Sequence, residues 1–412
     1  MDGSSAAGSA STHIEHGTRL FWRANLALFL AGFCNFGLMY DVQPLLPEFS
    51  RDFHLSPTAA SLSLSLTTGV LAFAMLIGGA VSDAFGRKRV MLVSLLVSAA
   101  LTLVLSAMPS WHGMLVLRAL MGLSLCGVPA VAMAYVSEEM HVRSVGLAMG
   151  LYIGGTAVGG MGGRLITGVL TDLVGWRLAL AAMGVVGVLA ALAFWRILPA
   201  SRHFTARRLR PAALGRAFVG LLGDRGLPWL FAEGFVLMGA FVTVYNYIGY
   251  RLLAPPYGLS QSAVGMIFAV YLVGIFSSTW MGHLANRLGR RRVLWSAFAI
   301  SLAGIGLTAC VSLWAIVLGM AVLTFGFFAG HSIVASWVGR RATHSKAQAS
   351  SLYLFAYYMG SSVAGSLGGQ FWATRGWHGV AVFTACLSLA GLLMALRLTR
   401  LAPLPGNAPA AA

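Results

Sequence analysis

Three charged side chains lie inside long apolar stretches of this sequence: Asp41, Arg118 and Arg164. If these stretches cross a lipid bilayer, each charge costs at least about 2.5 kcal/mol unless a partner or water compensates it. Counted at about 1.5 Å per helical residue, all three lie roughly 9 to 12 Å from the outer ends of their stretches. A carboxyl group can bind and release a proton and a guanidinium group can bind an anion, so we expect the functional site at this depth.

We interpret Asp41 and Arg118 as a switchable ion pair that couples protons to transport. While the guanidinium is near, the carboxylate stays ionised; when the arginine is drawn away, the buried carboxyl binds a proton. The alternative is a permanent buried ion pair that joins two helices. The positions related to these two by an internal repeat, Ile248 and Gly319, are uncharged, which favours a functional role confined to one half.

Other ionisable groups in the apolar stretches each have more than one possible role. Arg164 binds an anionic group of a substrate, is a second partner of Asp41, or extends outward to the membrane surface. Its repeat position, Gln370, is also polar, so both are expected to face water. Glu233 is either an interfacial carboxylate paired with an arginine of the preceding loop or a second proton site. His331 is either a packing residue or a second proton carrier.

Aromatic and amide side chains near these groups form the candidate substrate cavity. Tyrosines also concentrate at membrane surfaces, so some of them are expected there instead. Such a cavity suits small amphipathic organic molecules. The cavity candidates are Asn35, Tyr40, Gln43, Arg164, Tyr247, Tyr357 and Gln370, with Tyr245, Asn246, Tyr353 and Tyr358 nearby.

Long hydrophobic stretches must position these residues. The chain is 58% hydrophobic and 9% charged, far below the roughly 25% charged residues of soluble domains. An even number of spans places both termini on one side, and the basic loops make that side the cytoplasm. Twelve stretches are long enough to cross about 30 Å of hydrocarbon: residues 22–47, 57–80, 88–108, 112–136, 144–170, 176–199, 228–250, 261–283, 292–310, 313–338, 347–372 and 377–399.

The composition also excludes several classes of protein. The net charge is +17, but most of the 28 Lys and Arg lie in the termini or in loops on one side, as the positive-inside rule requires, so no nucleic acid partner is expected. The four cysteines lie in hydrophobic stretches without metal-ligand spacing, so we expect no metal site. Without a zinc-protease motif, paired carboxylates or a Walker loop, neither an enzyme, a cofactor nor an ATP-driven pump is expected.

One loop occurs twice. Gly79 to Arg89 reads GAVSDAFGRKR, and Gly282 to Arg292 reads GHLANRLGRRR. Two glycines around a short polar turn, followed by a basic cluster, are typical of a tight cytoplasmic turn, and the repetition indicates a duplicated bundle. The expected divisions are a disordered cytoplasmic tail (1–20), a six-helix bundle (21–199), an arginine-rich linker with a candidate amphipathic helix (200–227), a second bundle (228–400) and a C-terminal tail (401–412).

These motifs resemble the major facilitator superfamily over nearly the whole chain. Arg118 followed by Gly122 is similar to the fourth-helix motif of proton-coupled members, and YDVQPLLP at Tyr40 resembles bacterial arabinose-efflux-type and drug:proton antiporters. The superfamily's signature loop between the second and third helices matches at Gly79, Asp83, Gly86, Arg87 and Lys88. The fifth-helix glycine motif associated with antiporters matches at Gly155, Gly159 and Gly163.

The resemblance implies an all-α membrane protein of twelve transmembrane helices in two pseudo-symmetric six-helix bundles. It implies a monomeric secondary transporter of the bacterial inner membrane that exports a small organic or amphipathic molecule by proton antiport through alternating access. The alternative is a proton-coupled symporter that takes up an organic anion or a sugar-like solute. The loop with Asp83 is expected to gate the cytoplasmic side by pairing with an arginine or a helix N-terminus across the two bundles.

Overall fold

The computed structural model of the protein describes residues 13–204 and 211–400. In these ranges the chain is almost entirely helical, and the β contact recorded there is one parallel bridge between Ile14 and Met140. Eight of the described helices are long and apolar enough to cross a membrane. The expected all-α class is therefore confirmed.

Several helices in the first half of the chain begin at a hydroxyl side chain. Ser56 and Ser110 accept hydrogen bonds from the backbone N–H groups of Ala59 and Gly113, which would otherwise lack partners in the first turn. This half contains α1 (Arg19–Tyr40), η1 (Gln43–Leu45), α2 (Leu46–Asp52), α3 (Pro57–Phe85), α4 (Arg87–Ala107), α5 (Trp111–Leu125), α6 (Pro129–Glu139) and α7 (Val142–Ile197).

Two helices contain a sharp glycine break. The break in α7 is at Gly175, with φ 81°, and the break in α14 is at Gly376, with φ 56°; glycine reaches this backbone region without steric cost. Each of these long helices therefore covers two predicted stretches. The second half contains α9 (Leu227–Leu253), α10 (Gln261–Ile267), η2 (Phe268–Val270), α11 (Tyr271–Leu288), α12 (Arg290–Thr308), α13 (Leu313–Arg341) and α14 (Lys346–Thr399).

Three predicted stretches are interrupted where continuous helices were expected. Residues 22–47 leave the α-helix after Tyr40, and residues 112–136 are divided between α5 and α6, the second of which begins at Pro129. Residues 261–283 pass from α10 through η2 into α11. Proline explains the first two interruptions, because it cannot donate the backbone hydrogen bond that continues a helix.

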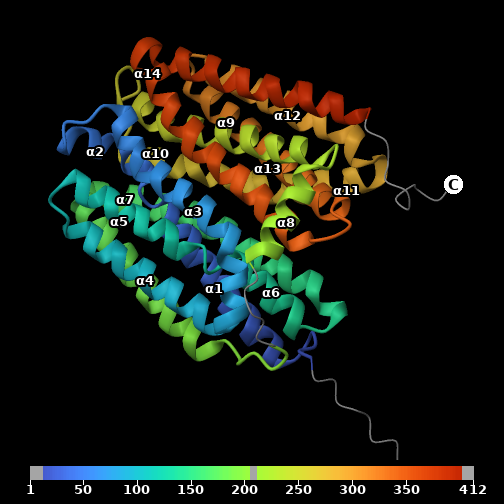
Figure 1. Ribbon diagram of the computed structural model, residues 1–412. Helices are drawn as coiled ribbons and strands as arrows, with labels where there is room; N and C mark the ends of the chain where they lie inside the picture. The colour runs from blue at the N-terminus through green and yellow to red at the C-terminus, as the bar shows by residue number, and fades with distance from the viewer. Residues whose placement is uncertain (1–12, 205–210, 401–412) are drawn as a thin grey trace, which may run out of the picture.

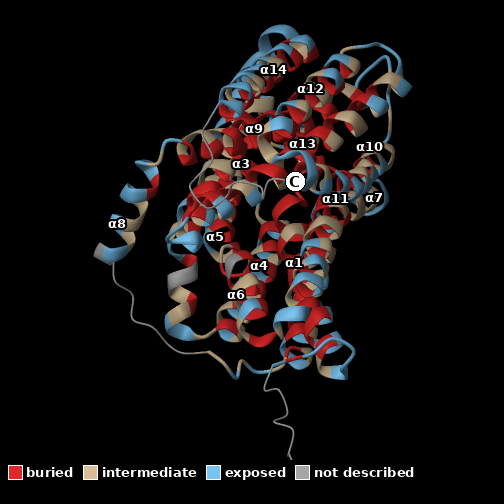
Figure 2. Ribbon diagram, turned by 90° about the vertical axis from the view of Figure 1, so that its right-hand side faces the viewer, coloured by how far each residue is buried: buried red, intermediate tan, exposed pale blue. Residues whose placement is uncertain are grey.

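The helices form two groups, one from each half of the chain (Figure 1). In the first half α1 packs along α7, and in the second half α9 packs along α14, so the same kind of pairing occurs twice. The halves meet where α3 packs against α14 and α7 packs against α10. Buried residues are concentrated between the helices and exposed ones on their outer faces (Figure 2).

Glycines allow the closest of these helix contacts. A Cβ atom at Gly159 of α7 would lie 2.2 Å from the carbonyl oxygen of Phe33 on α1, and one at Gly163 would lie 2.4 Å from that of Gly37. In the second half, a Cβ atom at Gly360 of α14 would lie 2.0 Å from the carbonyl oxygen of Phe235 on α9. The glycine motif of α7 thus sets how near α1 can approach.

The linker contains the expected helix, α8 (Pro211–Leu222), which lies at the edge of the molecule and contacts α9 and α14 (Figure 2). Residues 1–12, 205–210 and 401–412 of the expected tails and linker lie outside the described residues. The expected tail of residues 1–20 differs in its described part. The Ile14 N–H donates to the Glu139 carbonyl at 2.8 Å, and the His141 N–H donates to the Ile14 carbonyl at 2.9 Å, so this segment is attached beside the end of α6.

Candidate functional site

The break at the end of α1 positions Asp41. Pro44 has no N–H to donate to the carbonyl of Tyr40 four residues earlier, and proline also disfavours helical backbone at the preceding residue. The α-helix accordingly ends at Tyr40, and a 3-10 turn follows from Gln43. The carbonyls of the last turn of α1 therefore need other donors.

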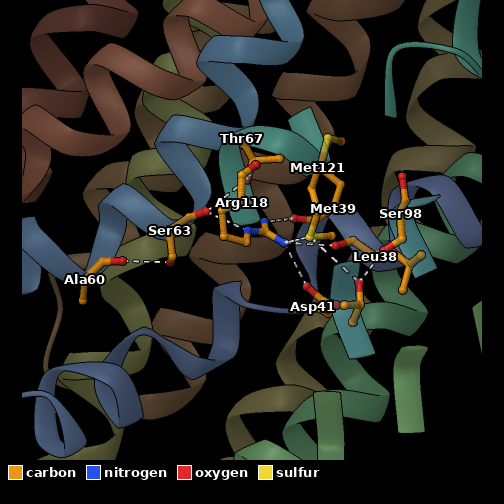
Figure 3. Close-up of polar contacts among 10 residues, drawn as sticks. Leu38, Met39, Asp41, Ala60, Ser63, Thr67, Ser98, Arg118 and Met121 are labelled. Carbon is orange, nitrogen blue, oxygen red and sulfur yellow. Dashed lines mark hydrogen bonds and ion pairs between the residues drawn. The ribbon is translucent and has the colours of Figure 1, made fainter. Parts of the chain in front are cut away.

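Arg118 of α5 supplies those donors (Figure 3). Its Nη2 donates to the Met39 carbonyl at 2.7 Å and its Nη1 to the Leu38 carbonyl at 3.2 Å, while Nε donates to the Ser63 carbonyl of α3 at 2.8 Å. A cation at a helix C-terminus is also favoured by the helix dipole. Arg118 is fully buried, and these backbone contacts join α5 to both α1 and α3.

Asp41 is held less firmly than Arg118. Its Oδ1 lies 3.4 Å from Arg118 Nη1, and both side chains are 0% exposed. Its Oδ2 is buried and has no hydrogen-bond partner among the described residues. The structure thus brings the predicted pair together, but the arginine keeps three carbonyl acceptors that do not depend on the carboxylate. Protonation of Asp41 would leave Arg118 hydrogen-bonded in place.

Arg164 of α7 has no contact with Asp41 among those that the structure describes. It is 1% exposed, so it does not extend to the membrane surface either. Its Nε donates to Gln43 Oε1 and its Nη1 to the Gly160 carbonyl, both at 2.5 Å. The guanidinium carbon lies 4.0 Å from the ring centre of Tyr40 and 4.8 Å from that of Tyr271.

Gln43 links Arg164 to the second half of the chain. Its Nε2 donates to Asn246 Oδ1 of α9 at 2.6 Å, and both amides are 1% exposed. Because the same side chain accepts from Arg164, the three residues form one chain of hydrogen bonds from α7 through η1 to α9. We call Gln43 and Asn246 the amide latch.

More polar contacts join the halves at this end, which is opposite the repeated basic loops and which we call the closed end. Tyr250 OH donates to the Leu46 carbonyl at 2.8 Å. Gln261 Nε2 donates to Glu48 Oε1 at 3.2 Å, and the Ser262 N–H donates to Asp172 Oδ2 at 2.7 Å. The side chains that close this end therefore come from α2 and α7 on one side and from α9 and α10 on the other.

The remaining sequence candidates are dispersed. Asn35 is buried, and neither of its amide atoms has a hydrogen-bond partner among the described residues. Tyr247 is buried and donates to the Gly365 carbonyl at 2.8 Å. Gln370 is exposed on α14 and is not among the contacts of Arg164.

A second group of titratable side chains lies within the second half. Glu233 is 0% exposed, and neither carboxyl oxygen has a partner among the described residues, so the expected pairing with a linker arginine is not found there. His331 is partly buried, its Nδ1 lies 2.7 Å from Tyr353 OH, and its ring centre lies 4.8 Å from that of Tyr357. His331 is thus hydrogen-bonded, as in its packing interpretation. Tyr357 contacts this group and also interacts with Tyr40 and Tyr271 of the group around Arg164, so it lies between the two.

The first copy of the repeated loop holds a local ion network. Asp83 of α3, which also contains Gly79, lies 2.6 Å from Arg87, and Arg87 lies 2.6 Å from Glu138 of α6. The partner of Asp83 was expected across the two bundles, but Arg87 lies in the first half. The halves are joined at the closed end, so charges at the other end pair locally.

The loop geometry repeats in the second copy. Gly86 and Gly289 both have φ close to 90°, at 93° and 91°, and each lies between two helices. Arg290 Nη2 donates to Asn286 Oδ1 at 2.7 Å, over the same four-residue spacing as Asp83 and Arg87. Lys88 instead donates to the Leu198 carbonyl at the end of α7.

Several residues of these networks were not predicted from the sequence. Glu138 lies two residues after a predicted apolar stretch, and Asp172 lies between two such stretches, so each has the position of an ordinary loop charge. Tyr271 lies within a predicted stretch, but its contact with Arg164 depends on how α11 approaches α7. Only the small number of acids, 11 in the whole chain, could have drawn attention to Glu138 and Asp172.

Comparison with known proteins agrees with this architecture. The family model of the Major Facilitator Superfamily matches residues 28–252 and 235–412. The chain is 51% identical over 387 residues to the inner membrane transport protein YnfM of Escherichia coli, covering 94% of this chain and 93% of that one. It is 46% identical over 394 residues to the uncharacterized MFS-type transporter YybF of Bacillus subtilis, covering 96% and 98%.

Two solved structures share the fold. The nucleoside transporter NupG, in a mutant form, has a TM-score of 0.77 at 15% identity and covers 92% of this chain and 99% of its own. A bacterial homologue of the human lysosomal transporter Spinster, in an inward-facing and unoccupied conformation, has a TM-score of 0.72 at 16% identity and covers 93% and 98%. The family match and the two close relatives establish that the chain is a multi-pass membrane transporter of the Major Facilitator Superfamily.

Proposed function

We propose that the chain exports a small organic or amphipathic molecule by proton antiport, through alternating access of two six-helix bundles. The number of spans would be twelve. The glycine breaks divide α7 and α14 into two spans each, α5 and α6 together form one span, and α12 is the remaining span of the second bundle. The basic loops support a cytoplasmic position for both termini.

The observation that carries proton coupling is the unequal attachment of Asp41 and Arg118. Asp41 has one oxygen 3.4 Å from the guanidinium and one without a partner among the described residues. Arg118 keeps the carbonyls of Leu38, Met39 and Ser63. The acid can therefore gain or lose a proton while the N–H groups of Arg118 keep their carbonyl acceptors, so the arginine stays in place even though its counter-charge is lost.

Alternating access is supported by where the halves are joined. The amide latch and the contacts of Tyr250, Gln261 and Asp172 all lie at the closed end. With the basic loops on the inside, this arrangement corresponds to a closed outer side. Transport requires these contacts to separate while the two loops at Gly86 and Gly289 approach each other.

Export is the direction that the helix glycine pattern favours, since Gly155, Gly159 and Gly163 resemble the motif of antiporters. Proton-linked uptake of an organic anion is the second candidate. Arg164 fits it, because a buried guanidinium without a carboxylate partner among the described residues suits an anion, but the same site would suit an exported anion equally. The direction of solute flux relative to proton flux, measured with the protein in one known orientation, decides between export and uptake.

Oriented proteoliposomes that contain a pH-sensitive dye test the function. Solutes are added singly from a panel of sugars, carboxylates, sulfonates, amines and neutral aromatics. We expect at least one solute to move protons across the membrane in the opposite direction to its own flux. Solute flux without proton movement would contradict proton coupling, and movement of both in one direction would replace export by uptake. Liposomes without protein give the background leak.

A further inference from the structure

Arg164 differs from the other buried arginines in having no negatively charged partner within the part of the chain that the structure describes. Arg87 is paired with Asp83 and Glu138, Arg341 with Asp224, and Arg118 with Asp41. Among the described residues no carboxylate lies at ion-pair distance from Arg164. Burial of a charge without a counter-charge is costly, so an external anion would lower the free energy of this site.

Aromatic rings from both halves surround the same guanidinium. Tyr40 belongs to α1, whereas Tyr271 and Phe268 belong to the second half, with ring centres 4.0, 4.8 and 5.6 Å from the guanidinium carbon. Residues from both halves meet at one cation, as a site exposed alternately to the two sides requires. The rings offer apolar surface to the body of an organic molecule, and the guanidinium offers a fork of donors.

We propose that Arg164 binds the anionic group of the transported molecule, which is therefore an organic carboxylate or sulfonate. This inference rests on the proposed transport function and specifies its substrate class. The anion would pair with the guanidinium in two hydrogen bonds, a geometry that arginine offers and lysine does not. Tyr40 and Tyr271 would contact the organic body.

Binding at Arg164 would also act on the amide latch. Nε of Arg164 is bound to Gln43 Oε1, and Gln43 in turn donates to Asn246 of the other half. A carboxylate or sulfonate that accepts from Nε displaces Gln43, because a charged acceptor forms a stronger hydrogen bond than an amide. Gln43 then loses one of its two partners, which weakens a contact that keeps the closed end shut.

The test is ligand-dependent thermal stability of the purified protein in nanodiscs, read from the fluorescence of its 11 tryptophans. The probes are benzoate and benzenesulfonate, with benzamide and benzylamine as neutral and cationic counterparts. We expect the two anions to raise the melting temperature of the wild type and the counterparts to raise it less. Equal effects of benzoate and benzamide, or no effect of either anion, would overturn the proposal.

Substitutions assign the effect to the site. Arg164→Gln should weaken anion binding by on the order of tenfold or more. Arg177→Gln is the matched control, because Arg177 also stacks on an aromatic ring, at 4.3 Å from Trp176, but is exposed. Undiminished anion binding by Arg164→Gln would refute the assignment. If that variant does not fold, Arg164→Lys takes its place. Because lysine keeps the charge but not the two-bond geometry, a smaller loss is expected for benzoate and none for benzamide, and undiminished benzoate binding would refute the assignment.

The experiment separates this inference from the transport proposal, because it needs no proton gradient. Arg164-dependent anion binding without proton-linked flux would refute the proposed coupling and leave the anion site intact. Proton-linked transport of neutral or cationic solutes by a protein that binds neither anion would refute the anion site and leave the proposed coupling intact.

Discussion

Gly159→Ala is expected to separate α7 from α1. The new Cβ atom would lie 2.2 Å from the carbonyl oxygen of Phe33 and 2.5 Å from its Cα. These are backbone atoms, which cannot rotate away, so the helices must move apart by about 1 Å to restore ordinary contact. Overpacking of this kind costs about 1 to 3 kcal/mol, against which alanine regains up to about 1 kcal/mol of helix propensity. Asp41 is on the displaced segment, so transport should fall as well.

Gly150→Ala is the matched control on the same helix. A Cβ atom at Gly150 would have no neighbour within 4 Å, so this variant should be as stable as the wild type or slightly more stable. Thermal unfolding in nanodiscs should therefore rank Gly150→Ala at or above the wild type and Gly159→Ala below both. Equal melting temperatures for the two variants would refute the close-packing argument.

Three further predictions concern the polar networks. Asp83→Asn should lower the transport rate without changing the melting temperature, because Arg87 keeps its second carboxylate; an unchanged rate would remove the gating role. Asn246→Leu should increase labelling, from outside, of cysteines introduced at the closed end, and unchanged labelling would count against the amide latch. Burial alone would raise the pKa of Asp224, but hydrogen bonds from Arg341 and two backbone N–H groups lower it below its usual value. Because the pKa of Asp224 is lower in the folded state than in the unfolded state, the ionised carboxylate stabilises the protein at pH values above the unfolded-state pKa. This stabilisation is lost as the pH falls through the folded-state pKa. Asp224→Asn should therefore lower the melting temperature at pH 7, with a difference that narrows below about pH 4; a constant difference would contradict the argument.

Much of the fold was predictable from the sequence because lipid-spanning helices need long apolar runs. The predicted boundaries near residues 170 and 176, and near 372 and 377, lie at the glycine breaks of α7 and α14. The end of α1 at Tyr40 was missed, since the segment after it still contains Val42, Leu45 and Leu46, and the signal for the break is Pro44. A run of apolar residues does not indicate where the backbone hydrogen bonds of a helix end.

The candidate site was predictable only in part. The cost of a charge in the membrane pointed to Asp41, Arg118 and Arg164, and the pairing of the first two was predicted, but their common depth also left Arg164 open as a partner of Asp41. The bonds from Arg118 to the carbonyls of Leu38 and Met39 could not be foreseen, because these carbonyls are free only where α1 breaks. Glu233 had two interpretations, a pair with a linker arginine or a second proton site, and it is buried without a partner among the described residues. The rotation of each helix about its own axis decides which neighbours such a side chain meets, and the spacing of residues along the chain does not determine that rotation.

Accumulation of a transported solute against its gradient tests the central claim most directly. Asp41→Asn is compared with the wild type in oriented proteoliposomes under an imposed pH gradient, and Asp52→Asn, at an exposed acid on α2, is the control. If Asp41 carries the coupling proton, its variant should exchange solute down a gradient but accumulate none against it, while the control behaves like the wild type. Full accumulation by Asp41→Asn would contradict the account and make Glu233 or His331 the next candidate.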